Sequence, residues 1–412
     1  MEEGFPFNLL LSDVLLSVLS LLLFLVDVVL DLWAVVSLYQ EQKYLSMGLL
    51  ISLLLGSSLL LQIFSWLWYS DSSKNQETKV ERFVSRHGLL APVHICQLGV
   101  FLRFAAVMEI SSRSFKQSDL RRTGIAVYLN HDLSMLRMFE AFSESAPQLV
   151  LMTALIMEMP ELHVFTVVKI VGSLSSLSFT MLSYHRNMRA FVPEKQKMGW
   201  SSSVIYFLWN LFLIGPRVVC VCLFASVLPC HIAAHFLSLW TLLVLWAWWQ
   251  KTDFMDTNAG EWLYRATVAL IWYFSWFNVV EGSTKLRGII YHMVIGVDTM
   301  LLLGLWWWRR SVESARLDPL PINPYLLIAM LIIIYIIGVL LKLVYYRKFH
   351  PKQPDLQLDE KDEKPERDPQ LILHSLGDNV ETDSCETPEP PNQRIVTGVH
   401  KRMKNMAVNF YY

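Results

Sequence analysis

The stretch that decides the fold is FNLLLSDVLLSVLSLLLFLVDVVLDLWAVVS at 7–37, an apolar run long enough to cross a bilayer as a helix. It nevertheless contains Asp13, Asp27 and Asp31. At about 100° per residue, the separations of 14 and 18 residues from Asp13 place all three on one stripe. A carboxylate at the bilayer centre costs roughly 2.5 to 3.5 kcal/mol, so such acids persist only when paired, protonated or hydrated. Two interpretations follow: ion pairs that hold a helix bundle together, or a polar track through the membrane.

The composition is that of a polytopic helical membrane protein. The 412 residues are 54% hydrophobic, and apolar runs of 18 or more residues recur along the chain. These runs are continuous and rich in leucine, which disfavours an outer-membrane barrel. The first run is too long and too acidic for a signal peptide, so we expect a retained first span. A formal net charge of −1 gives no support for binding to nucleic acid.

Motifs for enzymatic chemistry are absent from the sequence. The five cysteines lack the paired spacing of disulfides or zinc sites. No Gly-rich phosphate loop, nucleophile elbow or metal-ligand spacing occurs. We therefore predict a protein that is not an enzyme, has no catalytic residues and uses neither a metal nor another cofactor.

Ten apolar segments alternate with short loops, three of which are distinctly basic. The segments lie near 7–37, 46–69, 88–108, 133–157, 162–183, 203–228, 232–250, 263–280, 288–308 and 322–346. If the basic loops after 69, 108 and 183 are cytoplasmic, the segment 88–108 must leave and return on one side of the membrane. Its glycines, its proline and Arg103 favour broken backbone that is buried in protein.

In the second half, the segment 263–280 likewise has two apolar segments before it and two after it, so it corresponds to the segment 88–108. We therefore predict an all-α polytopic membrane protein with about eight transmembrane helices plus two re-entrant helical segments, and with both termini cytoplasmic. These form two repeats of five segments, at 1–200 and 201–350. Ten plain spans are the alternative, because the loop 309–321 carries three arginines but must lie outside.

The C-terminal tail changes character twice. Twelve acids and three bases occupy 355–389, so 351–393 is predicted to be an acidic disordered linker. The end, 394–412, has four basic residues and no acids, with apolar residues at helical spacing between them. These apolar residues are Val399, Met403, Met406 and Phe410. The segment is either a frayed tail or membrane-surface helix, or an autoinhibitory helix that docks back on a tether open to proteolysis.

A second polar stripe occurs in the fourth segment, where Arg137, Glu140, Glu144 and Gln148 follow one another at helical spacing. Intramembrane ionisable residues are functional candidates by default. Alternating charges at different depths would hydrate a groove suited to a zwitterionic headgroup. The predicted lipid path consists of Asp13, Asp27, Asp31, Arg103, Arg137, Glu140, Glu144, Arg217 and Asp298. His235 is interpreted as a hydrogen-bonded histidine of the bundle.

Several longer motifs resemble those of the XK-related membrane proteins over about residues 8–351 and again near the C-terminus. They are DLWAVV at 31–36, FSWLW at 64–68, LSMLRMFEAFSESAPQL at 133–149, SSVIYFLWNL at 202–211, TDFM at 252–255, EWLYR at 261–265, YFSWFN at 273–278 and LVYYRKFHP at 343–351. The resemblance implies a phospholipid scramblase of the plasma membrane that works without ATP or calcium. An executioner caspase would activate it in apoptosis, exposing phosphatidylserine. It also implies a single-span immunoglobulin-type partner of the basigin or neuroplastin kind.

The caspase site that the resemblance implies departs from the family form Asp-x-x-Asp-Gly. Asp362 completes Asp-x-x-Asp in DLQLDEKDE at 355–363, but Glu363 follows it. VETD at 380–383 is followed by Ser384, so Asp383 is the preferred cleavage site and Asp362 the second. Two other functions stay open on the residues alone: a solute transporter, or a non-transporting subunit of a membrane assembly.

Overall fold

A computed structural model describes residues 11–71, 78–116, 120–156, 164–191, 198–280, 284–312 and 323–349, and this part of the chain is all-helical. In chain order the helices are α1 (Leu11–Gln40), α2 (Tyr44–Asp71), α3 (Lys79–Arg86), α4 (Leu90–Ile95), α5 (Gly99–Lys116), α6 (Leu120–Glu140), the π-helix η1 (Ala141–Ser145), α7 (Ala146–Ile156), α8 (Val164–Phe191), α9 (Trp200–Val227), α10 (Pro229–Trp249), α11 (Asn258–Phe274), α12 (Thr284–Val312) and α13 (Pro324–Lys348). The predicted linker 351–393 and C-terminal helix 394–412 lie outside the described residues.

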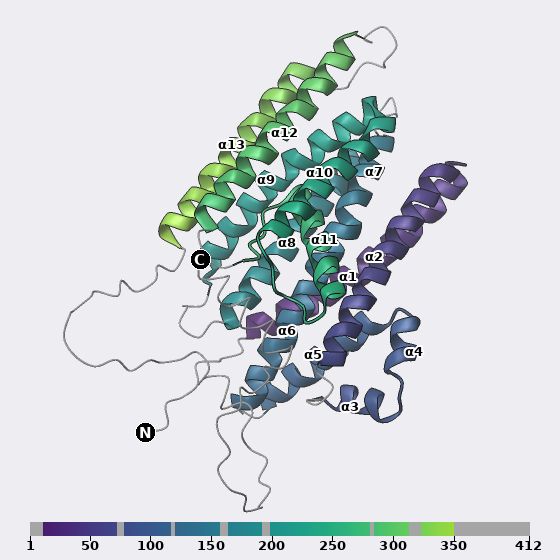
Figure 1. Cartoon of the computed structure of the whole chain (residues 1–412), viewed down its shortest axis with the longest axis vertical. Coiled ribbons are helices and arrows are strands. Elements are labelled where there is room, and N and C mark those ends of the chain that lie inside the picture. The colour runs from purple at the N-terminus through teal and green to yellow at the C-terminus, as the bar shows by residue number, and fades with distance from the viewer. Residues whose placement is uncertain are drawn as a thin grey trace, which may run out of the picture.

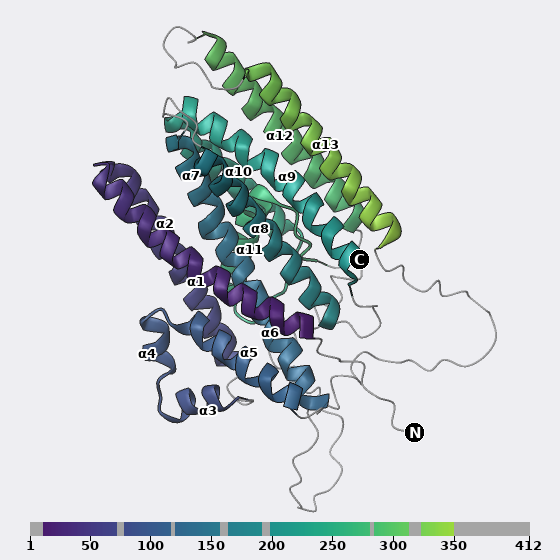
Figure 2. The ribbon, with the colours of Figure 1, turned by 180° about the vertical axis from the view of Figure 1, so that it is seen from behind.

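Within the described residues, six helices are long and apolar enough to cross a bilayer: α1, α2, α9, α10, α12 and α13. Two further long segments, α8 and the continuous run from α6 through η1 to α7, lie beside them in the same bundle (Figures 1 and 2). The expected all-α polytopic membrane fold is therefore confirmed. The number of crossings and the division into repeats at 1–200 and 201–350 stay predictions.

The first half of the bundle reverses direction once before α3. A three-residue turn with a positive φ of 59° at Gln42 joins α1 to the antiparallel α2. Ser17 near the beginning of α1 contacts Asn130 of α6, and Asp31, farther along α1, contacts Gln148 of α7. The segment α1 and the segment α6–α7 therefore run parallel. The helices α3, α4 and α5 consequently begin and end at one end of the bundle, where Figure 1 shows them grouped. This geometry agrees with a segment 88–108 that does not cross.

A comparable interruption occurs in the second half. Helix α11 runs antiparallel to α10, because Trp240 donates a hydrogen bond to the Ala266 carbonyl while Phe236 packs on Tyr273. After α11 ends, the chain continues from Ser275 in extended backbone, and Trp276 and Phe277 are buried there. The predicted re-entrant segment 263–280 is thus a helix followed by a buried, non-helical return.

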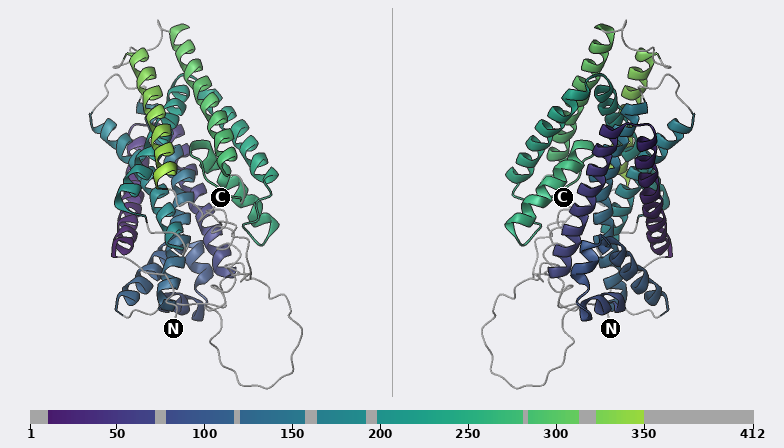
Figure 3. Two further views of the ribbon diagram at one scale, coloured as in Figure 1. Left: turned by 90° about the vertical axis from the view of Figure 1, so that its left-hand side faces the viewer. Right: turned by 90° about the vertical axis from the view of Figure 1, so that its right-hand side faces the viewer.

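Helix α9 forms the centre of the bundle. In the 18-residue apolar stretch of α9, 72% of the residues are buried, whereas the share in the corresponding stretch of α13 is 11%. Helix α13 therefore presents most of its surface outward. The two helices approach closely at Gly338, where an added Cβ would lie 3.0 Å from the carbonyl carbon of Phe212. Seen from the sides in Figure 3, the long helices run in one general direction. Their outward apolar side chains are the surface expected to contact lipid tails.

The loop between α10 and α11 is fixed by one carboxylate. Glu261 accepts hydrogen bonds from the backbone amides of Phe254, at 2.8 Å, and Met255, at 2.7 Å. The Phe254 ring then stacks on Tyr264, with ring centroids 4.2 Å apart, and approaches Trp68 of α2. This loop therefore joins the two halves of the bundle.

Candidate functional site

One face of α1 carries polar side chains that meet α6, η1 and α7. Ser17 Oγ donates to Asn130 Oδ1 at 2.7 Å. Farther along, Asp27 Oδ2 accepts from Ser145 Oγ at 3.3 Å. The row from Ser17 to Asp31 extends for about 21 Å along the helix axis. A polar seam this long inside an apolar helix pair is the feature that the sequence predicted from the acid stripe.

Acidic side chains gather toward the Asp31 end of this seam, and we call these four side chains the acidic groove: Asp27, Asp31, Glu140 and Glu144. Glu140 pairs with Arg137 one turn earlier on α6. Glu144 forms side-chain hydrogen bonds with Ser57 of α2 and with Asp31. Through Glu144, η1 is thus connected to both α1 and α2.

The Arg137 guanidinium lies between acid and aromatic groups. Its Cζ is 4.8 Å from the centroid of the Phe24 ring, a cation–π contact that supplements the Glu140 pair. Phe24 itself is only 7% exposed and packs on Phe101 and Phe104 of α5. The cation is therefore held at a defined depth in the bundle, between the beginning of α1 and the acidic groove.

The π-helix η1 sets which way the acids face. The amide of Ala146 donates to the carbonyl of Ala141, five residues earlier, as in a π-turn. Pro147 has no amide hydrogen and its ring crowds the carbonyl four residues before it, which explains the irregular turn at this place. Glu144 lies within η1, and Gln148 lies after it. Because a π-turn inserts an extra residue, these side chains take a direction that a regular helix would not give them.

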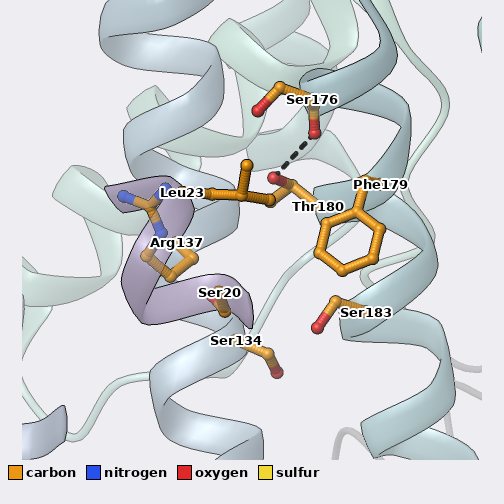
Figure 4. A pocket seen from close by; sticks show the side chains of 8 residues that line it. All are labelled: Ser20, Leu23, Ser134, Arg137, Ser176, Phe179, Thr180 and Ser183. Atoms are coloured by element: carbon orange, nitrogen blue, oxygen red, sulfur yellow. Dashed lines mark hydrogen bonds between the residues drawn. The ribbon is translucent and has the colours of Figure 1, made fainter. Parts of the chain in front are cut away.

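A small pocket opens beside the seam, between α1, α6 and α8 (Figure 4). We call it the hydroxyl-lined pocket; its lining residues are Ser20, Leu23, Ser134, Arg137, Ser176, Phe179, Thr180 and Ser183. It is wide enough for roughly one water molecule. It lies on the side of the acidic groove from which α1 begins, since Ser20 precedes Asp27 on α1 by about two turns.

Arg103 belongs to a different cluster, on α5. Its Nη1 lies 3.4 Å from Asp132 Oδ2, and its Nε donates to Ser65 Oγ at 3.0 Å. The Cζ also lies 4.2 Å from the centroid of the Tyr69 ring. This buried arginine thus ties α5 to α2 and α6. The fourth apolar segment was predicted to begin at residue 133, so Asp132 was not among the intramembrane acids considered as partners of Arg103.

Arg217 anchors the corresponding cluster in the second half. Its Nη1 pairs with Asp298 Oδ2 of α12 at 2.6 Å, and its Nε donates to the carbonyl of Tyr273 at 3.1 Å. His235 lies 2.9 Å from the other oxygen of Asp298 and 3.0 Å from the hydroxyl of Tyr273. This network joins α9, α10, α11 and α12. It also shows His235 as a hydrogen-bonded residue of the bundle.

The predicted path residues therefore fall into three groups. Those of α1 and α6–η1 share the seam, whereas Arg103 and the pair Arg217 and Asp298 lie in separate clusters with acids of their own. Asp13 lies in the first turn of α1, and its side chain is outside the described part. Asp362, Asp383 and the four apolar residues of the predicted C-terminal helix also lie outside it. Among the residues described, no group of three His, Cys, Asp or Glu could hold a metal ion.

A half-buried lysine on α13 was not among the residues predicted from the sequence. Lys342 Nζ lies 2.5 Å from His292 Nε2 of α12 and 5.0 Å from the centroid of the Trp209 ring. An isolated lysine near the end of a long apolar run usually extends to the membrane surface. The sequence offered no sign that this one would turn inward.

Comparison with known proteins shows which family this chain resembles. The profile of the family described as "XK-related protein" matches residues 15–351. XK-related protein 8 of Tetraodon nigroviridis is 41% identical over 357 residues, which cover 85% of this chain and 86% of that protein. XK-related protein 8 of Gasterosteus aculeatus is 42% identical over 349 residues, covering 82% and 84%. The Pan troglodytes protein of the same name is 39% identical over 345 residues, covering 83% and 85%.

Proposed function

The chain belongs to the XK-related family, as its sequence motifs indicated, and we propose that it is a phospholipid scramblase. In this proposal it lets phospholipids of different headgroups exchange between leaflets without ATP or calcium, and so exposes phosphatidylserine at the cell surface. An executioner caspase activates it during apoptosis by cutting at Asp383, and Asp362 is the second candidate for the cleavage site.

The seam between α1 and α6–η1–α7 carries this proposal. Ionisable side chains inside a membrane are costly and mark the pathways of polar substrates. Here Asp27 and Glu140 lie within apolar helices, beside the Arg137 guanidinium. Carboxylates suit the choline or amine of a lipid headgroup, and a guanidinium suits its phosphate.

The surface of α1 on either side of the seam fits a path that keeps acyl chains in lipid. Leu22, Val26 and Val29 are 54%, 53% and 61% exposed, although they lie within two turns of the acidic groove. A headgroup in the seam would therefore have apolar surface next to it for its tails. The side chains need only lower the barrier to headgroup transfer, so no group has to act as a catalytic acid or base.

In this proposal the C-terminal tail regulates the protein, and its release activates lipid exchange. The basic end with Val399, Met403, Met406 and Phe410 would dock on the cytoplasmic face of the uncut protein, and cleavage would detach it. We also propose residence in the plasma membrane, with cytoplasmic termini, and association with a single-span immunoglobulin-type protein of the basigin or neuroplastin kind. These elements rest on the resemblance and on the charge pattern of the tail.

Reconstitution tests the function directly. The purified full chain is placed in vesicles with a fluorescent lipid in both leaflets, and dithionite is added before or after caspase treatment. A scramblase carries bleaching beyond about half of the signal, since inner lipids become accessible. We expect this only after verified cleavage. Bleaching that stops at about half both before and after cleavage, with or without the single-span partner, would contradict the proposal.

A further inference from the structure

The polar row on α1 is interrupted at Leu23. Ser20, about one turn earlier, lines the hydroxyl-lined pocket, whereas Asp27, about one turn later, belongs to the acidic groove. Leu23 is half-buried, and Figure 4 shows its side chain extending from α1 across the pocket toward Thr180 of α8. A polar guest that moved from the pocket to the groove along α1 would meet this side chain.

Two hydroxyl groups of the pocket bond to the backbone of their own helices. Thr180 Oγ1 donates to the Ser176 carbonyl at 3.0 Å, and Ser134 Oγ donates to the His131 carbonyl at 2.8 Å. Each hydroxyl thus bonds to its own helix, so neither bond holds two helices together. Their oxygen lone pairs stay available, and the hydroxyls can rotate to donate. This lining suits a water molecule.

Two large apolar side chains, Leu23 and Phe179, lie among these hydroxyls. An apolar constriction between two polar regions blocks passage because water leaves it. The neighbouring residue Phe24 fixes α1 at this depth, since it is buried on Phe101 and under the Arg137 guanidinium. Leu23 therefore has a defined position.

We propose that Leu23, with Phe179, is an apolar gate between the hydroxyl-lined pocket and the acidic groove. In the uncut chain it holds back water and the phosphate-bearing headgroup of a lipid. The role of this gate in lipid movement rests on the proposed scramblase function, whereas its role in water access does not.

Thiol labelling reads water access independently of lipid transport. Ser145→Cys serves as the reporter, because Ser145 bonds to Asp27 beyond the gate. Cys96, Cys230 and Cys385 are replaced by serine, and the remaining cysteines are buried. A charged methanethiosulfonate reagent is applied to the reconstituted, uncut protein from the side on which α1 begins. We expect Leu23→Ser to raise the labelling rate by about tenfold.

Matched variants on the same helix provide the control. Leu22→Ser and Leu25→Ser change side chains that are 54% and 43% exposed, so the labelling rate should not change. Leu23→Ser should also raise lipid movement in the uncut protein, and Leu23→Phe should lower it in the cut protein. Leu23→Ala keeps the site apolar but smaller, and it should raise labelling less than Leu23→Ser does.

The outcomes separate the gate from the scramblase function. Labelling that is equal in the parent, Leu23→Ser and Leu23→Ala would overturn the gate, as would an equal rise in Leu22→Ser. If labelling rises as expected but lipids do not cross even after cleavage, the gate for water stands and the scramblase function fails. If lipids cross after cleavage at the same rate in every Leu23 variant and labelling is also unchanged, only the gate fails.

Discussion

Gln148 on α7 donates a hydrogen bond of 2.6 Å to Asp31 on α1, across 117 residues of sequence. This contact occurs because η1 and Pro147 redirect α7 just before Gln148. It places an amide beside a carboxyl that also bonds to Glu144. The geometry of the acidic groove thus depends as much on the path of the backbone as on the acids themselves.

Neutralising the groove should stop lipid movement without preventing delivery to the surface. We expect the triple variant Asp27→Asn, Asp31→Asn, Glu144→Gln to lower the scrambling rate of the cut protein by about tenfold or more, because amides hydrate and attract headgroups less strongly. Dithionite bleaching measures the rate and surface biotinylation measures delivery. A non-transporting assembly subunit would show no change in either measurement.

Removing the irregular turn should also impair function. Pro147→Ala restores an amide hydrogen, so the helix can return to regular bonding, which favours the helix by about 3 kcal/mol. The side chains after η1 would then rotate away from Asp31. We expect a stable protein with reduced scrambling. Pro324→Ala is the control, because Pro324 occupies the first turn of α13, where no intrahelical donor is needed. Equal scrambling in both variants would show that the turn has no role.

Breaking the Arg217 and Asp298 pair should destabilise the second half of the bundle. Arg217 is 2% exposed, so Arg217→Gln leaves Asp298 without its guanidinium and should cost about 3 to 5 kcal/mol. The double variant with Asp298→Asn should recover part of this loss, since no charge then stays uncompensated. Thermal unfolding followed by size-exclusion chromatography measures both. A double variant less stable than Arg217→Gln would contradict the pairing.

The loop between α10 and α11 should depend on Glu261. Glu261→Ala leaves the buried amides of Phe254 and Met255 without their acceptor, and each such loss costs about 1 to 3 kcal/mol. We therefore expect a clear fall in the thermal midpoint. Glu41→Ala removes an exposed carboxylate near Lys43 and should have little effect. Similar midpoints for the two variants would show that Glu261 does not hold the loop.

The cleavage site can be assigned by substitution. Asp383→Ala should abolish both the caspase cut and the rise in scrambling, whereas Asp362→Ala should leave most of each. Immunoblotting of the C-terminal fragment, alongside the bleaching assay, distinguishes the two positions. If cleavage persists in Asp383→Ala and is lost in Asp362→Ala, the preference between them is reversed.

The properties that could be predicted from the sequence are those that belong to a single segment. The hydropathy of each run and the basic loops predicted the spans and the two interrupted segments, and α3–α5 and α11 agree with that geometry. The acid stripe of α1 and the polar stripe from Arg137 to Gln148 were also predicted from helical spacing, although the π-turn of η1 changes the direction of Glu144 and Gln148. The hydroxyl-lined pocket did not, because serines and threonines are ordinary in membrane helices and carry no signal singly.

The membrane class, the family and the presence of charges inside apolar helices can be read from the sequence, since each follows from the order of residues along one segment. The pairing of these charges, in contrast, depends on how the helices pack. Asp132 pairs with Arg103, and Asp298 pairs with Arg217. The acids of α1 lie beside Arg137 and contact side chains around η1. Hydrogen bonds and ion pairs between side chains act over about 3 Å. Partners so distant in sequence are brought within that reach only by the packing of the helices.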